Sequence, residues 1–108
     1  KLQARMRLRE ATERYAVALG KPYGRLTLRD TTSRWGSCST QGNINYSWRL
    51  IMAPPEVLNY VAAHEVAHLA EMNHSARFWA LVERLFPNHA EQRAWLREHG
   101  EDLHRYLF

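Results

Sequence analysis

The stretch that decides the fold is Val61-Ala62-Ala63-His64-Glu65-Val66-Ala67-His68. It lies inside a run, residues 54–72, whose apolar side chains recur at the spacing of one side of an α-helix. Those residues are Val57, Leu58, Val61, Ala62, Val66 and Leu69. The opposite, more polar side carries Glu56, Asn59, Ala63, Ala67 and Glu71. Pro54 and Pro55 are suited to the start of such a helix, because their missing N–H groups have no partner there in any case. The pattern predicts one helix that packs against the rest of the domain.

This helix carries the motif His-Glu-x-x-His. His64 and His68 are one helical turn apart, so both imidazoles can reach one metal ion. Glu65 lies beside them, where it can take the proton of an attacking water molecule. All three fall within or at the edge of the apolar side, where ionisable groups are costly unless they are paired or bound to metal. The alternative is a pair of hydrogen-bonded core histidines beside a salt-bridged glutamate.

A catalytic zinc site needs a third protein ligand, and His74 is the first candidate. It follows His68 by six residues, the spacing of the longer motif HExxHxxGxxH, although Glu71 stands in place of the glycine. Asn73 is the residue best able to adopt a left-handed conformation and turn the chain after a helix end near Met72. The remaining candidates for the third ligand are Glu83, Glu91, Glu98 and Cys38.

The other segments predict an α+β domain. Residues 2–19 have a helical stripe and end at Gly20. Alternation predicts strands at residues 25–29 and from residue 44, the latter bent or split near Trp48, in a small antiparallel sheet that ends at Ala53. Gly36, beside a tryptophan, indicates a bulge or a close approach of two backbones. Helices are predicted from Ser75 to residue 86 and again after Asn88.

Composition and charge limit the classes of protein that fit. The chain has 108 residues, enough for one domain, and no apolar run long enough to span a membrane. The single cysteine, Cys38, excludes an internal disulfide, and we expect a cytoplasmic protein. The net charge of +4 is uneven, because residues 1–29 carry eight Lys or Arg against two Glu. This basic segment predicts either nucleic-acid association or, more simply, a solvated helix face.

Several separate motifs occur in a specific order. They are Ser33-Arg34-Trp35-Gly36-Ser37-Cys38-Ser39, Gly42-Asn43-Ile44-Asn45, Trp48-Arg49-Leu50, Ala53-Pro54-Pro55, His64-Glu65-Val66-Ala67-His68-Leu69, Asn73-His74-Ser75 and Phe78-Trp79. Over residues 25–100 the chain resembles the YgjP-like family of predicted zinc metallopeptidases, which is related to the SprT-like proteases. Val66 departs from the leucine that is common there. The resemblance implies a zincin-like fold with an N-terminal helix, a small sheet, an active-site helix and C-terminal helices.

The resemblance also implies one Zn²⁺ per chain, held by His64, His68 and His74, with Glu65 as general base. It implies that family members carry more chain on the N-terminal side. We therefore expect residues 1–108 to be a single zincin-like domain, the C-terminal part of a longer protein. Further contacts to the substrate or to its oxyanion are expected from Arg34, Tyr60, Asn73 and Asn45.

The sequence thus favours a zinc-dependent peptidase acting on peptides or proteins. An extended substrate is expected to pair with a free sheet edge near residues 43–47. Three alternatives remain open: a zinc hydrolase of a non-peptide substrate, a DNA-associated SprT-like protease, and a binding module in which zinc only stabilises the fold.

Overall fold

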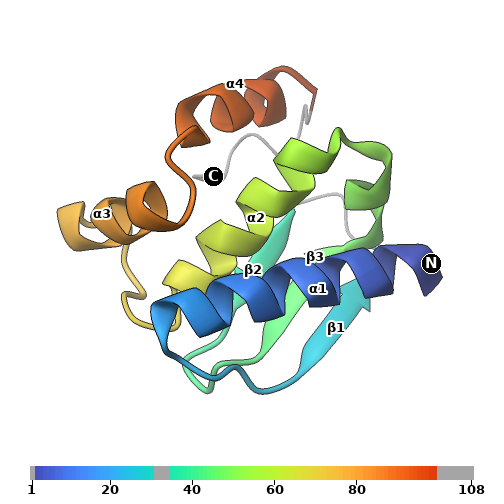
Figure 1. Cartoon of the computed structure of the whole chain (residues 1–108). Coiled ribbons are helices and arrows are strands. Elements are labelled where there is room, and N and C mark those ends of the chain that lie inside the picture. The colour runs from blue at the N-terminus through green and yellow to red at the C-terminus, as the bar shows by residue number, and fades with distance from the viewer. Residues whose placement is uncertain (1, 31–34, 100–108) are drawn as a thin grey trace.

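The computed structural model of the chain describes residues 2–30 and 35–99. Arg34 and the segment after His99, with Gly100 and His104, lie outside the described residues. The elements follow in the order α1 (Leu2–Leu19), β1 (Leu26–Arg29), β2 (Gly36–Cys38), β3 (Ile44–Ser47), η1 (Trp48–Met52), α2 (Pro55–Ala67), α3 (Ala76–Leu85) and α4 (His89–His99). Figure 1 shows α2 at the centre of the molecule, beside α1. The predicted α+β class is confirmed.

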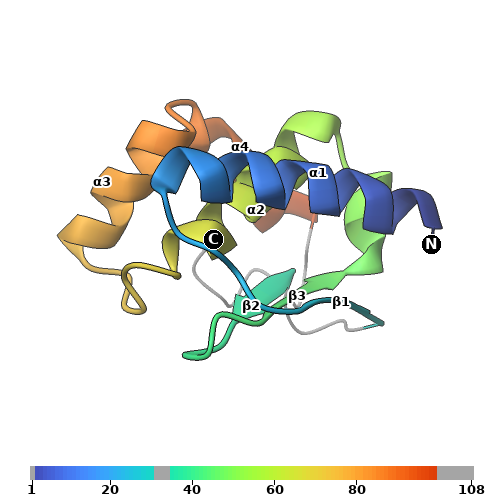
Figure 2. The ribbon, with the colours of Figure 1, turned by 60° about the horizontal axis from the view of Figure 1, so that its bottom comes forward.

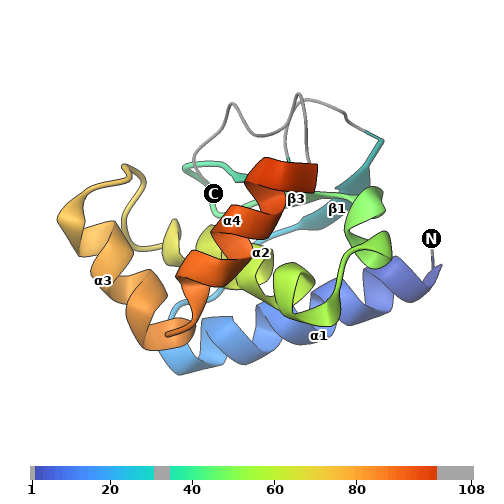
Figure 3. The same ribbon diagram turned by 90° about the horizontal axis from the view of Figure 1, so that it is seen from above.

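The molecule has two layers. Figure 2 shows the three strands on one side and the helices together on the other. Helix α2 contacts β2 and η1 as well as the three other helices, and Figure 3 shows α4 lying across it. The core between the layers includes Leu8 of α1, Ile44 and Tyr46 of β3, and Val61 and Val66 of α2, all fully buried. The HExxH helix is therefore the element on which the others pack.

The sheet differs from the predicted antiparallel one. Its strand order is β1-β3-β2, with β2 and β3 antiparallel but β1 and β3 parallel. Leu26 of β1 pairs with Ile44, and Gly36 of β2 pairs with Tyr46. The hairpin turn at residues 39–43, with Gly42 at φ +83°, places β2 against β3. Strand β1 takes the other side of β3 and runs parallel to it.

This order makes β3 the central strand. The expectation that residues 43–47 form a free edge for an extended peptide is therefore wrong, because both edges of β3 are already paired. Asn45 is held between the two neighbouring strands. Its Oδ1 accepts a hydrogen bond from Nε of Arg29 at 3.4 Å, and its Nδ2 donates to Oγ of Ser37 at 3.4 Å.

The alternating pattern from residue 44 to residue 52 does not form one strand. Strand β3 ends at Ser47, whose Oγ accepts a hydrogen bond from the backbone N–H of Arg49 at 3.3 Å. This side-chain cap starts the short helix η1, in which Leu50 is fully buried while Met52 is 67% exposed. The predicted break near Trp48 is confirmed, but the segment after it is helical rather than extended.

Helix α2 is shorter than predicted and more completely buried. It ends at Ala67 with His68 as its C-cap, instead of near Met72. Every residue from Tyr60 to Ala67 is buried, so Ala63 and Ala67 do not form part of a polar side. Their small side chains let neighbouring elements approach the helix all round. None of the described non-glycine residues has positive φ, so Asn73 does not supply the left-handed turn that was expected.

The remaining helices follow the prediction closely. Helix α1 spans the predicted residues 2–19, and Oγ1 of its buried Thr12 shares a 2.8 Å hydrogen bond with the hydroxyl of Tyr46. Ser75 caps α3 by accepting a hydrogen bond from the N–H of Phe78 at 3.4 Å. None of the described helices has the length and apolar character needed to cross a membrane.

Candidate metal centre

Three histidines that are separated in sequence meet at one point. His64 and His68 come from the C-terminal end of α2, and His74 comes from the loop that leads into α3. Each offers one ring nitrogen, and the three nitrogens lie within 4.8 Å of one another. Among the described residues, these three histidines form the group of potential ligands that could hold one metal ion. The alternative ligands Glu83, Glu91, Glu98 and Cys38 do not belong to it.

The distance between two of the three nitrogens matches that expected at a zinc ion. The Nε2 atoms of His64 and His74 are 3.3 Å apart. Two nitrogens bound at about 2.05 Å in tetrahedral geometry are separated by about 3.3 Å. The donor set also fits, because three imidazoles suit zinc and leave a fourth position for water or substrate.

Hydrogen bonds orient two of the three rings. His68 donates from Nδ1 to the backbone carbonyl of Glu71 at 2.9 Å, since a carbonyl oxygen can only accept. This fixes the proton on Nδ1 and leaves the lone pair of Nε2 for a metal. Nδ1 of His64 lies 3.2 Å from the hydroxyl of Tyr60, one helical turn earlier on α2. Helix α2 ends at Ala67, and the turn that follows brings the backbone carbonyl of Glu71 to Nδ1 of His68.

One aromatic side chain supports all three histidines. The Phe78 ring is stacked on His68 with centroids 4.3 Å apart, and it meets the rings of His64 and His74 edge-on at 4.9 Å each. Phe78 is fully buried. The sequence predicted a helix over this segment but carried no signal for this role of Phe78, because an apolar residue that supports a site looks like any other core residue.

Desolvation lowers the pKa of all three imidazoles, most strongly at His64. Desolvation lowers the pKa of His64 well below its ordinary 6.5, and the neighbouring His68, His74 and Arg93 lower it further. The pKa values of His68 and His74 are also lowered, mainly by burial, although the carbonyl of Glu71 partly opposes this at His68. Neutral imidazoles are the form that binds metal.

A positive charge next to the site was not predicted. Arg93 of α4 holds its guanidinium carbon 4.2 Å from the centroid of the Trp79 ring. Trp79 in turn stacks on His74, with centroids 6.0 Å apart at an interplanar angle of 28°. Arg93 lies far from the motif in sequence, so no residue spacing indicates its position. The packing of α4 on α2 brings it close to the histidines.

Glu65 points from α2 toward the sheet. It is 1% exposed, and its side chain packs against Gly36 of β2. A methyl group added at Gly36 would lie 3.1 Å from Oε2 of Glu65 and 3.1 Å from the backbone oxygen of Asn45. The close approach predicted at Gly36 is therefore confirmed, and the group that approaches it is the carboxylate of the motif.

We expect Gly36→Ala to disturb this carboxylate selectively. The backbone of Asn45 in the central strand cannot readily move, so Glu65 has to shift by a few tenths of an ångström. A misplaced catalytic group lowers turnover steeply, and we expect a loss of kcat on the order of tenfold or more with little change in metal content. Peptide hydrolysis and elemental analysis of the same preparation measure both. Gly20→Ala is the control for strain away from the site, since nothing lies within 4 Å of its added methyl group while its φ of +79° strains the backbone. We expect it to lower the melting temperature and to leave kcat unchanged. Equal activity of Gly36→Ala and wild type would contradict the expectation.

The family model described as YgjP-like, metallopeptidase domain, matches residues 1–99. The chain belongs to the YgjP-like family. The crystal structure of the metallopeptidase zymogen of Pyrococcus abyssi abylysin has the same fold, with a TM-score of 0.77 and 22% sequence identity over 89% of this chain and 98% of that chain. Among curated proteins, no significant match is found. The chain is thus a predicted metallopeptidase, a hydrolase, and its predicted zincin-like fold is confirmed.

The remaining predicted site residues of this YgjP-like domain are dispersed. Tyr60 is fully buried behind His64, Asn45 is bonded within the sheet, and Asn73 is exposed immediately before His74. Cys38 is partly buried on β2, and burial together with the nearby Glu65 raises its pKa to about 12. Its thiol is therefore protonated at neutral pH, as is typical of a packed side chain and not of a nucleophile.

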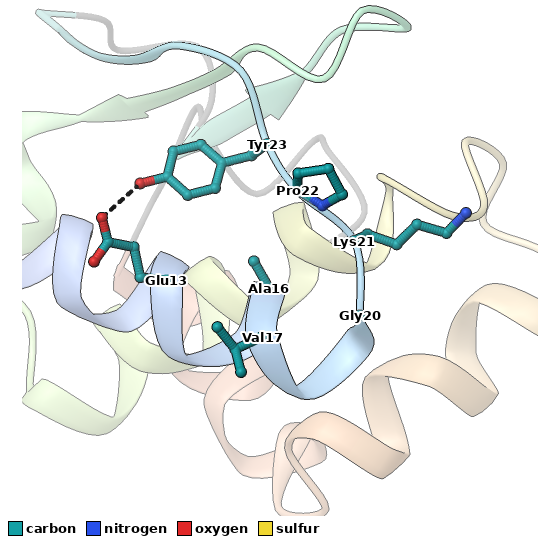
Figure 4. A pocket seen from close by; sticks show the side chains of 7 residues that line it. All are labelled: Glu13, Ala16, Val17, Gly20, Lys21, Pro22 and Tyr23. Atoms are coloured by element: carbon teal, nitrogen blue, oxygen red, sulfur yellow. Dashed lines mark hydrogen bonds between the residues drawn. The ribbon is translucent and has the colours of Figure 1, made fainter.

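A cavity of about 500 Å³ lies elsewhere on the YgjP-like domain, between the end of α1 and the loop that follows it (Figure 4). A hydrogen bond of 3.2 Å from the Tyr23 hydroxyl to Oε2 of Glu13 crosses it. Its lining is Glu13, Ala16, Val17, Gly20, Lys21, Pro22 and Tyr23. Neither the three histidines nor Glu65 lines this cavity, so it is not part of the candidate metal centre.

Proposed function

We propose that this YgjP-like chain is a zinc-dependent peptidase that holds one Zn²⁺ through His64, His68 and His74. The observation that carries the proposal is the convergence of three imidazole nitrogens within 4.8 Å, with a buried carboxylate next in sequence to the first of them. A zinc ion at such a site supplies Lewis acidity, which polarises a carbonyl group and lowers the pKa of a bound water molecule to about 7.

Glu65 is the proposed general base. Its carboxylate accepts the proton of the attacking water and passes it to the nitrogen of the leaving amine. The packing of Gly36 against Glu65 supports this role, because the glycine leaves room for the carboxylate between α2 and β2.

Arg93 is the described positive group whose charge acts on both His64 and His74. We propose that the same charge favours the oxyanion that develops when water attacks the carbonyl. Asn73, Asn45 and Arg34 stay predictions as substrate contacts. Tyr60 is better placed to act on His64 than on the substrate, because its hydroxyl is buried behind that ring.

The experiment that tests the proposal combines elemental analysis with a peptidase assay. We expect about one zinc per chain after gentle purification and zinc-dependent cleavage of a mixed peptide library, lost with chelator and restored by Zn²⁺. Iron or manganese in place of zinc would correct the identity of the metal. A chain that holds no metal and cannot be loaded would contradict the proposal. Loaded protein that cleaves no peptide but hydrolyses other esters or amides would favour the non-peptide hydrolase.

Nucleic-acid association stays a prediction. The arginines of α1 at positions 5, 7 and 9 are exposed, which fits both a nucleic-acid contact and a solvated helix face. DNA binding with a steep salt dependence that disappears when these charges are reversed would separate the two.

A further inference from the structure

The hydroxyl of Tyr60 is aimed at a metal ligand from inside the core. Tyr60 and His64 are one turn apart on α2, and both are buried, with exposures of 0% and 1%. The hydroxyl oxygen lies 3.2 Å from Nδ1 of His64. The other ring nitrogen of His64, Nε2, faces His74. The two nitrogens of this one imidazole therefore have different partners, a phenol on one side and the metal centre on the other.

A metal bound at Nε2 would select one tautomer of His64, and the Tyr60 hydroxyl is placed to accept the proton of that tautomer. A neutral imidazole carries its proton on one nitrogen only, and a metal at Nε2 requires the proton to be on Nδ1. In that tautomer Nδ1–H donates to the Tyr60 oxygen. His68 makes the equivalent contact with the backbone carbonyl of Glu71. Since Tyr60 contributes through its side chain, the contact at His64 can be removed by a substitution, whereas the backbone contact at His68 cannot.

The ring of Tyr60 is itself held in place. It meets Phe86 edge-on with centroids 6.0 Å apart, and Phe86 meets Tyr15 of α1 at 6.5 Å. The ring also packs edge-on against His64, with centroids 5.9 Å apart. Contacts from α1 and from the end of α3 therefore fix the hydroxyl relative to Nδ1, and the contact does not depend on a mobile side chain.

We propose that Tyr60 is a positioning residue of the metal centre, whose hydroxyl accepts a hydrogen bond from Nδ1–H of His64 and so holds the ring in the orientation that presents Nε2 to the ion. This inference rests on the proposed zinc site. Hydrogen-bond partners of metal-binding histidines typically contribute about 10- to 100-fold in metal affinity. The effect is expected in zinc affinity first, and in turnover only to the extent that the zinc is lost or displaced.

The test is Tyr60→Phe, which removes the hydroxyl and keeps the ring. We expect the Kd for Zn²⁺, measured by competition with a chromophoric chelator, to rise by about 10- to 100-fold. The matched control is Tyr46→Phe. Tyr46 is also fully buried, and its hydroxyl is bonded to Thr12 at 2.8 Å rather than to a metal ligand. We expect this control to lower the melting temperature of the metal-free chain while leaving the Kd within about twofold.

Nuclear magnetic resonance gives a readout that a merely structural role would not move. In the zinc-loaded wild type, the Nδ1 proton of His64 should be slowly exchanging and hydrogen-bonded, and this protection should be lost in Tyr60→Phe. If Tyr60→Phe does not fold, the exchange rate of the His64 Nδ1 proton in the zinc-loaded wild type tests the inference by itself. An unchanged Kd in Tyr60→Phe, or a rapidly exchanging Nδ1 proton in the wild type, would overturn the inference. A wild type that binds no zinc would instead remove the proposed metal site itself.

Discussion

Glu65→Gln is expected to keep one zinc per chain and to lose peptidase activity by about 10²- to 10⁴-fold. The amide has nearly the shape of the carboxylate, so its fit against Gly36 is preserved. It cannot accept the proton of the attacking water, because its oxygen is far less basic. The three histidine ligands are untouched, so the metal should stay. Elemental analysis and kcat/KM on a cleaved peptide from the library measure the two quantities on one preparation.

The control for Glu65→Gln is Glu56→Gln, the same change in the exposed first turn of the same helix. It should leave both zinc content and activity within about twofold of wild type. Activity retained in Glu65→Gln would show that another group acts as the base. Loss of zinc together with activity would assign Glu65 a structural role in the metal centre.

His74→Ala is expected to lose most of the bound zinc. Apparent zinc binding free energies of about 10–16 kcal/mol for four-ligand sites correspond to about 3 kcal/mol per ligand, more than a hundredfold in affinity. His74 is exposed and lies in a loop, so its removal should leave the fold of the metal-free chain intact. Zinc titration followed by elemental analysis measures the loss, and circular dichroism with chelator present verifies the fold.

His99→Ala serves as the comparison for His74→Ala. His99 is also exposed, and its ring stacks on Trp95 at 4.1 Å, outside the three-histidine group. This variant should bind zinc as wild type does. If His74→Ala bound zinc with unchanged affinity, the third ligand would have to be another residue, and the proposed ligand set would be wrong.

Residues close in sequence allowed much of the structure to be predicted. The helix over residues 2–19 follows from a local apolar stripe, and the cap at Ser75 from one side chain and the N–H three residues later. The histidine ligands could be proposed because two of them share one helical face. The third, His74, follows His68 after a short loop, and the shortness of that loop keeps His74 near the other two histidines.

Other features depend on contacts between distant segments. β1 pairs with β3 rather than with its sequence neighbour, and nothing in the four residues Leu26–Arg29 specifies the direction of that pairing. Ser47 ends a strand whose alternation continued to Met52, because one side-chain hydrogen bond there favoured a helical turn. In both places a short local pattern fits two conformations, and packing against the rest of the molecule selects one.

The sequence by itself determined the ionisable groups of the candidate site, since their spacing on one helix and the next loop is a local property. Only the tertiary structure decided what surrounds them. Phe78 contacts all three imidazole rings, and the hydroxyl of Tyr60 contacts Nδ1 of His64. Gly36 packs against Glu65, and the charge of Arg93 acts on His64. These neighbours come from different elements, and aromatic, glycine and arginine residues are common in any core or surface. Their role is visible only once packing has fixed their distances to the histidines and to Glu65.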